Sequence, residues 1–248
     1  MKLILNGCLG RMGRAVTELA AARGHEVVVG IDVAAGAAAY PVLTDWSAAP
    51  AADAVIDFSN PAALAAELDY ATAHGLPLVL CTTGLSAEQM AAVQDAATRI
   101  PVFFSSNMSL GVAVLSALTK KAAAVLGDTF DIEIVEMHHN QKLDAPSGTA
   151  LMLADAAKAG LSYEPEYTYD RHTRRQKRDK KEIGIAALRG GTVVGEHSVY
   201  FAGEQEVITL SHSAGSRSVF AAGALTAAAF LQGKPAGMYS MEDVLGDI

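Results

Sequence analysis

The residues with the densest chemistry lie in one short stretch, 136–150, which reads EMHHNQKLDAPSGTA. It contains the imidazoles of His138 and His139, the ammonium of Lys142 and the carboxylate of Asp144. Such groups can hold a negatively charged ligand or deliver a proton during a reaction. A polar loop before an ordinary capped helix is the simpler alternative, but the density of titratable groups favours a functional site.

The elements on either side would hold this loop in place. Residues 131–136 alternate polar and apolar side chains, which predicts a half-buried strand. An alanine-rich helix is predicted to follow, to about Lys158, with Ser147 as its N-cap. The first backbone N–H groups of a helix, here around Gly148 and Thr149, lack partners within the helix and favour an anion such as a carboxylate.

The beginning of the chain predicts a dinucleotide-binding unit. An apolar strand at 2–6 is followed by a glycine turn at 7–13, a helix to about 23 and a second strand that ends in Asp32. The acid follows the turn at about the 20-residue spacing at which a carboxylate binds the adenosine ribose. The glycines are spaced G-x-x-G-x-x-G, which departs from the usual G-x-G-x-x-G, and Arg11 adds positive charge where a pyrophosphate would lie.

Strands and helices continue to alternate in the first half of the chain. Strands are predicted at 54–58, 78–81 and 102–104, with helices at 62–73 and 87–97. This order predicts an α/β fold with a doubly wound parallel sheet and a ligand at the carboxyl ends of its strands. The loops at those ends, 59–61, 81–84 and 105–108, are small and polar, which suits a nicotinamide and its ribose, although each alone is ordinary turn chemistry.

The pattern changes after Met108. A helix at 110–126, the strand and helix of the motif, and strands near 183–188, 195–201 and 206–212 predict a second, mixed α/β domain with an open sheet. A further helix is predicted at 217–232.

Bulk composition limits the function. The chain has 248 residues, enough for one or two domains, and 51% of them are hydrophobic. Its formal net charge of −8 argues against a general nucleic-acid binder. Cys8 and Cys81 do not suggest a disulfide framework, and no signal peptide or membrane span is expected, since the apolar run 219–231 is too short. We expect a cytoplasmic protein.

Two motifs resemble one enzyme family. His-His-x-x-Lys-x-Asp-Ala-Pro-Ser-Gly-Thr-Ala, from His138, is similar to the substrate motif of the 4-hydroxy-tetrahydrodipicolinate reductase (dihydrodipicolinate reductase) family. The opening Gly-Cys-x-Gly-Arg-Met-Gly, from Gly7, resembles the start of the same family. The resemblance extends over essentially the whole chain and implies a Rossmann-type dinucleotide-binding domain at 1–108 with 217–248, and a substrate-binding and oligomerisation domain at 109–216.

The resemblance also implies a reaction and its residues. NADH or NADPH would reduce a cyclic imine dicarboxylate to tetrahydrodipicolinate in lysine and diaminopimelate biosynthesis. His138 would be the general acid/base and Lys142 the proton donor. His139 would contact one substrate carboxylate, and Ser147, Gly148 and Thr149 would bind the other. The implied cofactor-binding residues are Gly7, Cys8, Leu9, Gly10, Arg11, Met12, Asp32, Cys81, Thr82, Thr83, Ser105, Ser106, Asn107 and Met108.

Cofactor preference and assembly are further expectations. Asp32 would accept hydrogen bonds from both ribose hydroxyls and repel a 2′-phosphate, so we expect NADH to be preferred, with NADPH possible. Val33, the next residue, has no charge, whereas family members that use NADPH well often have an arginine there. The family resemblance implies a homotetramer assembled through the second domain.

Several alternatives remain at this point. The basic run 171–181 could be an RNA-binding arm, although it lacks interleaved aromatic residues and a solvated or subunit-contact loop is favoured. The histidines and acids show no metal-ligand spacing, so no metal is expected. Cys81 could be an acyl-forming nucleophile, but no activating base lies beside it in sequence. The protein could also be an aspartate-semialdehyde or homoserine dehydrogenase, or a nucleotide-sensing binding module.

Overall fold

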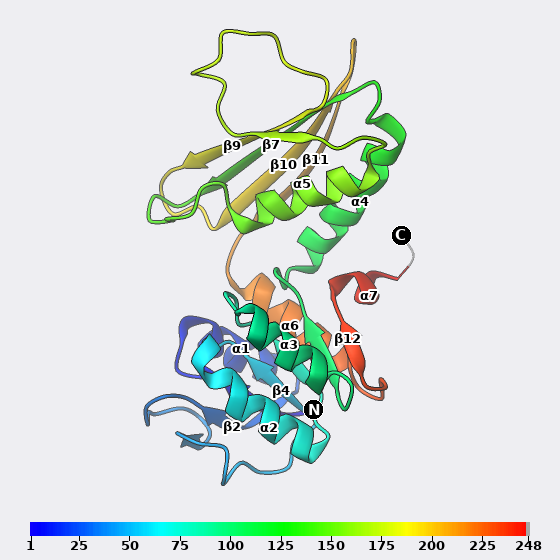
Figure 1. Cartoon of the computed structure of the whole chain (residues 1–248). Coiled ribbons are helices and arrows are strands. Elements are labelled where there is room, and N and C mark those ends of the chain that lie inside the picture. Colours follow the sequence, from blue (N-terminus) through cyan, green and yellow to red (C-terminus); the bar gives the residue numbers. More distant parts are fainter. Residues whose placement is uncertain (247–248) are drawn as a thin grey trace. The chain divides into compact units, whose positions relative to one another are not determined.

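The computed structural model describes residues 1–246 of the chain. The described residues form two compact units, 1–109 with 217–246 and 110–216. In Figure 1 the first unit combines the blue and cyan segments with the orange and red ones, so it is built from both ends of the sequence. Residues 247 and 248, included in the predicted range 217–248, lie outside the described residues.

The first unit contains a parallel sheet in the order β12-β6-β5-β4-β1-β2-β3. Its strands are β1 (Lys2–Asn6), β2 (Glu26–Ile31), β3 (Val42–Leu43), β4 (Ala54–Asp57), β5 (Leu78–Leu80), β6 (Pro101–Phe104) and β12 (Gly237–Tyr239). The chain proceeds outward from β1 on one side and from β4 on the other. This is the strand order of dinucleotide-binding folds, in which the ligand binds where the order reverses.

Helices cover both faces of this sheet, as the doubly wound prediction requires. They are α1 (Arg11–Ala22), α2 (Leu64–His74), α3 (Ala87–Ala96), α6 (Ser218–Phe230) and α7 (Met241–Leu245), with a short 3₁₀ helix η1 (Pro61–Ala63) before α2. Helix α1 packs against α6, and α2 packs against α3. Because both faces are covered, β1 is an uninterrupted apolar run whose Leu3, Ile4 and Leu5 are fully buried.

The second unit contains a mixed sheet in the order β11-β10-β7-β9-β8. Its strands are β7 (Asp131–His138), β8 (Glu166–Thr168), β9 (Glu182–Arg189), β10 (Gly195–Ala202) and β11 (Val207–Ala214). Strand β7 runs parallel to β9 and antiparallel to β10. Helices α4 (Leu110–Leu126) and α5 (Gly148–Gly160) pack together on one face of the sheet (Figure 1). This is the mixed α/β domain that the sequence predicts.

The differences from prediction are small and concern short edge strands. Strands β3, β8 and β12 were not predicted, because two or three residues carry no hydrophobic period. The predicted helix 62–73 starts as η1 and continues as α2, since Pro61 fixes the chain at its first position and Asn60 caps it. The predicted helix 217–232 is shorter at both ends and is observed as α6.

Candidate active site

Strand β7 presents two polar side chains on its buried face. Its residues alternate between partly exposed and buried, and the buried set contains Ile132, Ile134, Glu136 and His138. The first two join the apolar core of the unit. Glu136 is fully buried and His138 is 8% exposed. Residues two apart share a face of a strand, so the alternation directs a carboxylate and an imidazole to the same place.

Glu136 is held by three groups. Its Oε1 and Oε2 accept from the two terminal nitrogens of Arg189, each at 2.8 Å. Oε2 also accepts from Nδ1 of His138 at 2.6 Å, and Oε1 accepts from the backbone N–H of Ser147 at 3.0 Å. Burial by itself would raise the pKa of Glu136, but the hydrogen bonds from Arg189, His138 and Ser147 outweigh it and lower the pKa below its ordinary value. Glu136 is therefore ionised.

The geometry of His138 leaves one ring nitrogen for chemistry. An ionised carboxylate can only accept, so the proton in the contact with Glu136 lies on Nδ1. Nε2 faces Gly195 of β10, where a Cβ atom would lie 3.0 Å from it. Glycine at this position leaves space beside Nε2. The arrangement suits an imidazole that exchanges a proton through Nε2 while Nδ1 is fixed.

The loop after β7 contains the other predicted groups. His139 is half-buried, and its Nδ1 accepts from the backbone N–H of Gln141 at 3.3 Å. Nζ of Lys142 lies 2.8 Å from Oδ1 of Asp144. The hydrogen bond from Lys142 lowers the pKa of Asp144 below its ordinary value. The lysine thus has a counter-ion within its own loop.

Ser147 is the N-cap of α5, as predicted, and its Oγ accepts from the N–H of Ala150 at 3.2 Å. Its own N–H is already donated to Glu136, and its side chain is buried. Gly148, by contrast, is exposed at the beginning of the helix, and Thr149 follows it. The polar atoms of Ser147 are used inside the protein, whereas the helix start beyond it is accessible.

His197 of β10 completes the cluster. Its Nε2 lies 3.0 Å from Oγ of Ser147, and its ring meets that of His138 edge-to-face, with centroids 5.1 Å apart. Burial, together with the charge of His138, lowers the pKa of His197 to about 4. His197 is therefore neutral near pH 7 and acts as a hydrogen-bond partner. Within residues 1–246, no group of three or more His, Cys, Asp or Glu side chains is arranged to hold a metal ion.

A cavity of about 780 Å³ lies where the strand order of the first unit reverses. Its wall contains four of the predicted cofactor residues: Gly7, Leu9, Gly10 and Asp32. It also contains Ser59 and Asn60 of the polar loop 59–61, which the sequence suggested for the nicotinamide and its ribose. The wall further contains residues that sequence reasoning did not assign: Asn6, Ile31, Val33, Thr44, Asp45, Trp46, Ser47, Phe58, Ala62, Ala63 and Ala66. The volume suits a nucleotide-sized ligand.

The glycine turn has the geometry of a nucleotide-binding loop. Gly7 has a φ of 77°, and a Cβ there would lie 2.4 Å from the carbonyl oxygen of Phe58. Only glycine fits so close to neighbouring backbone. Oδ2 of Asp32 accepts from the N–H of Leu9 at 2.9 Å, so the acid is fixed against the turn. Arg11 and Met12 begin α1, with Arg11 exposed.

The remaining predicted cofactor residues do not line this cavity. Cys8 is buried and faces a smaller space of about 210 Å³. Cys81, Thr82 and Thr83 follow β5, and Ser105, Ser106, Asn107 and Met108 follow β6. Both groups follow the carboxyl ends of parallel strands, since β5 pairs with β4 and β6 pairs with β5. Thr83 and Ser106 are exposed there, whereas Met108 is buried.

The nucleophile alternative for Cys81 is not supported. Burial, followed by the nearby carboxyls of Asp57 and Glu67, raises the pKa of the Cys81 thiol well above its ordinary value. The thiolate, which is the reactive form, is therefore scarce. Cys8 and Cys81 are both free thiols.

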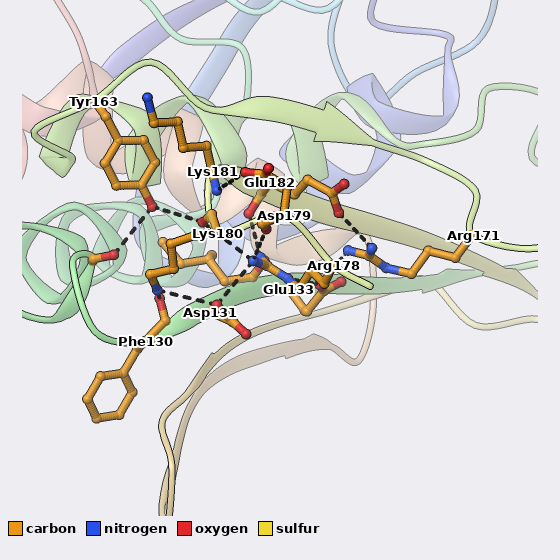
Figure 2. Close-up of polar contacts among 12 residues, drawn as sticks. Phe130, Asp131, Glu133, Tyr163, Arg171, Arg178, Asp179, Lys180, Lys181 and Glu182 are labelled. Carbon is orange, nitrogen blue, oxygen red and sulfur yellow. Dashed lines mark hydrogen bonds and ion pairs between the residues drawn. The ribbon is translucent and has the colours of Figure 1, made fainter. Parts of the chain in front are cut away.

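The basic run 171–181 forms the loop between β8 and β9, and its charges are largely met by acids of the same unit. Arg171 contacts Glu133 at 2.9 Å and Glu182 at 2.6 Å. Arg178 contacts the same Glu133 at 2.9 Å, and Figure 2 shows both arginines converging on these carboxylates. Arg171, Arg174, Arg178 and Lys180 have acidic partners and so less free charge to offer a phosphate, which weakens the RNA-binding alternative.

Taken together, the nucleotide-binding sheet and the unit that carries the histidine–lysine loop define a dinucleotide-dependent oxidoreductase. A family model described as dihydrodipicolinate reductase, N-terminus, matches residues 1–108, and one described as dihydrodipicolinate reductase, C-terminus, matches residues 111–245. The chain belongs to the dihydrodipicolinate reductase family. It is thus an NAD(P)H-dependent reductase of lysine and diaminopimelate biosynthesis.

Curated relatives agree over the whole length. The chain is 51% identical to a 4-hydroxy-tetrahydrodipicolinate reductase of Caldanaerobacter subterraneus subsp. tengcongensis, across 99% of this chain and 98% of that protein. It is 46% identical to the enzyme of the same name from Clostridium tetani, across 99% and 97%. These matches replace the aspartate-semialdehyde, homoserine and nucleotide-sensing alternatives.

Solved structures share the fold. A dipicolinate-bound dihydrodipicolinate reductase from Paenisporosarcina sp. TG-14 superimposes with a TM-score of 0.82 at 22% identity, covering 99% of both chains. A diaminopimelate dehydrogenase of C. glutamicum superimposes with a TM-score of 0.55 at 16% identity, covering 97% of this chain and 92% of that one. None of the helices in the described residues has the length and apolar character that a membrane crossing needs.

Proposed function

We propose that this protein transfers a hydride from NADH to C4 of the cyclic imine dicarboxylate derived from 4-hydroxy-tetrahydrodipicolinate, and that the loop after β7 binds and protonates this substrate. One hydride and one proton add to the ring to give tetrahydrodipicolinate, and the hydroxylated substrate also loses water. One observation supports the proposal most directly. The buried carboxylate of Glu136 contacts both the imidazole of His138 and the backbone N–H of Ser147. A proton-exchanging group and an accessible helix start are therefore held close together. The relative from Paenisporosarcina was solved with dipicolinate, a cyclic dicarboxylate.

Two sites of positive potential meet the two carboxylates of such a substrate. The backbone N–H groups of Gly148 and Thr149, at the beginning of α5, receive one carboxylate, helped by the helix dipole. His139 and Lys142 receive the other, with Lys142 exchanging its contact with Asp144 for the ligand. Ser147 supports the first site indirectly. It caps the helix, and its N–H and Oγ both form hydrogen bonds within the protein.

Two groups supply the proton. His138 acts through Nε2 as general acid/base, with Nδ1 held by Glu136. Lys142 donates a proton and offsets the negative charge that the ring gains with the hydride.

The cofactor preference is for NADH. Asp32 lies on the cavity wall, where it would accept from ribose hydroxyls and repel a 2′-phosphate. Val33 is 82% exposed on the same wall and has no charge to offer a phosphate. Arg11, the first residue of α1, is a candidate for compensation.

A homotetramer assembled through the second unit is the proposed state. The face of its sheet opposite α4 and α5 has exposed apolar side chains at Leu188 and Val207, with exposed fractions of 50 and 59%. Open sheet faces and edges of this kind need covering. The two free thiols support a reducing, cytoplasmic compartment.

The decisive experiment follows NADH absorbance with the product that dihydrodipicolinate synthase makes from pyruvate and aspartate semialdehyde. Rapid NADH oxidation that requires the synthase is the expected result. The control omits the synthase, and equal oxidation without it would point to reduction of the semialdehyde and overturn the proposal.

A further inference from the structure

One buried carboxylate, that of Glu136, connects His138, the start of α5 and the Lys142 loop, although the proposed reaction gives it no proton transfer of its own. Glu136 is fully buried in the middle of the sheet of the second unit. A buried charge is strongly unfavourable unless it is paired and hydrogen-bonded. Glu136 accepts four hydrogen bonds from three residues, so any effect on the site acts through them.

The partners divide between the two oxygens. Oε2 accepts from His138 and from one Arg189 nitrogen, and Oε1 accepts from the N–H of Ser147 and from the other Arg189 nitrogen. Arg189 also donates to the carbonyl of Asp144 at 2.7 Å. The same pair therefore touches the proposed acid, the start of α5 and the Lys142 loop.

Strand register explains this meeting. His138 and Arg189 are partners in the parallel pairing of β7 and β9. Glu136 lies two residues before His138 on the same buried face of β7. A bidentate arginine fixes the plane of the carboxylate, so the direction in which Oε2 meets the imidazole is set by the sheet itself.

We propose that Glu136, clamped by Arg189, is a positioning residue that keeps the proton of His138 on Nδ1, aims Nε2 at the substrate and ties this geometry to the start of α5. The proposal rests on the proposed role of His138 as general acid/base. It assigns Arg189 to orienting the carboxylate rather than to binding substrate.

Glu136→Gln tests the proton position directly. The amide N–H₂ would face Nδ1 as a donor, so His138 should move its proton to Nε2 while the amide oxygen can still accept from Ser147. Glu133→Gln is the matched control, because Glu133 lies on the opposite face of β7 and also pairs with two arginines, Arg171 and Arg178. Long-range ¹H–¹⁵N spectra of histidine-labelled protein report the tautomer, with His138→Gln used for assignment.

We expect an Nδ1–H pattern for His138 in the parent protein and in Glu133→Gln, and an Nε2–H pattern in Glu136→Gln. The kcat of Glu136→Gln should fall roughly 10²-fold, with the KM for the dicarboxylate changed much less, since the start of α5 remains tied. NADH affinity, read from the fluorescence of Trp46 in the cofactor cavity, should be unchanged in both variants.

The pH dependence of kcat gives a second test, in which Glu136→Gln and Arg189→Gln should shift the alkaline limb in opposite directions. The charged and titratable groups around His138 are Glu136, Arg189, His197 and the Lys142 loop. Removing the carboxylate disfavours the imidazolium, so the alkaline limb of kcat should move to lower pH in Glu136→Gln. Arg189→Gln leaves the carboxylate uncompensated and should move that limb to higher pH. This variant also serves if Glu136→Gln does not fold, because Arg189 is at the end of β9 and partly exposed.

The outcomes separate the two proposals. The positioning role is overturned if the tautomer of His138 is unchanged in Glu136→Gln. It is also overturned if Glu136→Gln and Glu133→Gln lose turnover and NADH affinity to the same extent. A changed tautomer with normal kcat leaves the positioning role intact and removes His138 as the acid. Shifts of the same sign in Glu136→Gln and Arg189→Gln would mean that both residues only maintain the fold, and this too would overturn the inference.

Discussion

Nζ of Lys142 lies 2.8 Å from Oδ1 of Asp144, two residues further along the same loop. The ammonium proposed to meet the substrate is therefore held in place before any ligand arrives. The pair is partly exposed, with side-chain exposures of 21% for Lys142 and 59% for Asp144, so a ligand carboxylate can reach and replace the contact. Because solvent screens such a pair, breaking the contact between Lys142 and Asp144 costs little free energy.

Lys142→Ala should lower kcat and raise the KM for the dicarboxylate together. Lysine meets both the bound substrate and the charge that develops on the ring, so its loss affects ground and transition states alike. Steady-state kinetics with a parallel NADH titration measures both effects. Lys158→Ala, in the last turn of α5, is the control and should behave like the parent. A pure KM effect in Lys142→Ala would leave proton donation to His138.

His138→Ala should mainly lower kcat, by roughly 10²–10⁴-fold, because a general acid contributes that much to a proton-transfer step. NADH affinity should hardly change, since the nucleotide cavity belongs to the other unit. Near-normal kcat in this variant would make His138 a positioning residue and leave Lys142 or water as the acid.

NADH should give the higher kcat/KM, and Val33→Arg should raise kcat/KM for NADPH roughly tenfold, as one charge-assisted hydrogen bond to a 2′-phosphate would provide. Val33→Gln is the neutral control of similar reach and should change NADPH use little. A clear preference of the parent protein for NADPH would contradict the role of Asp32.

Glu67→Gln should stabilise the protein near neutral pH. Glu67 is fully buried, and a contact with the Asn6 side chain only partly offsets the cost of burying its charge. Burial, with the charge of Asp57, raises its pKa well above the ordinary value. The folded state then binds more protons than the unfolded state once pH exceeds the ordinary glutamate range, so the free energy of unfolding falls as pH rises through that window.

The glutamine variant is neutral at every pH and should lack this decline. Urea unfolding at acid and neutral pH measures it, with exposed Asp69→Asn on the same helix as control. The two proteins should differ little in acid and most near neutrality. A Glu67→Gln protein that is less stable at both pH values would mean that the carboxyl has a required charged role.

Light scattering at micromolar concentration should report a tetramer. Val207→Glu, on the face of β11 opposite α4 and α5, should shift the protein toward smaller species, because it places charge in an apolar contact. Val125→Glu, on the exposed part of α4, is the control and should leave the mass unchanged. A monomeric parent protein would refute the assembly.

The parts of the fold that could be predicted are those whose hydrophobic pattern or local motif extends over enough residues to be recognised. The strand alternation at 131–136, the N-cap at Ser147 and the strand–turn–helix unit before Asp32 follow from local chemistry, and the structure confirms each. Strands β3 and β12 could not be found, because two or three residues gain their conformation only from pairing with a neighbour.

The site was predicted where its residues are neighbours in sequence and missed where they are not. Arg189 reaches Glu136 across 53 positions, and only the register of β7 and β9 brings them together. The alternation in β7 places Glu136 on the same face as Ile132 and Ile134, but it does not show which partners a buried carboxylate has there. Trp46 has no motif around it and reaches the cofactor cavity from the segment after β3.

The two-segment build of the first unit has a consequence for synthesis on the ribosome. Helix α6 is part of that unit's core, and at Gly223 it approaches the carbonyl oxygen of Met108 so closely that a Cβ would lie 1.6 Å from it. Strand β12 adds to the sheet edge at β6. Both elements leave the ribosome after residues 110–216 of the second unit, which emerge as one continuous segment. The inserted unit can therefore fold first, and the nucleotide-binding unit becomes complete only when residues 217–246 join it.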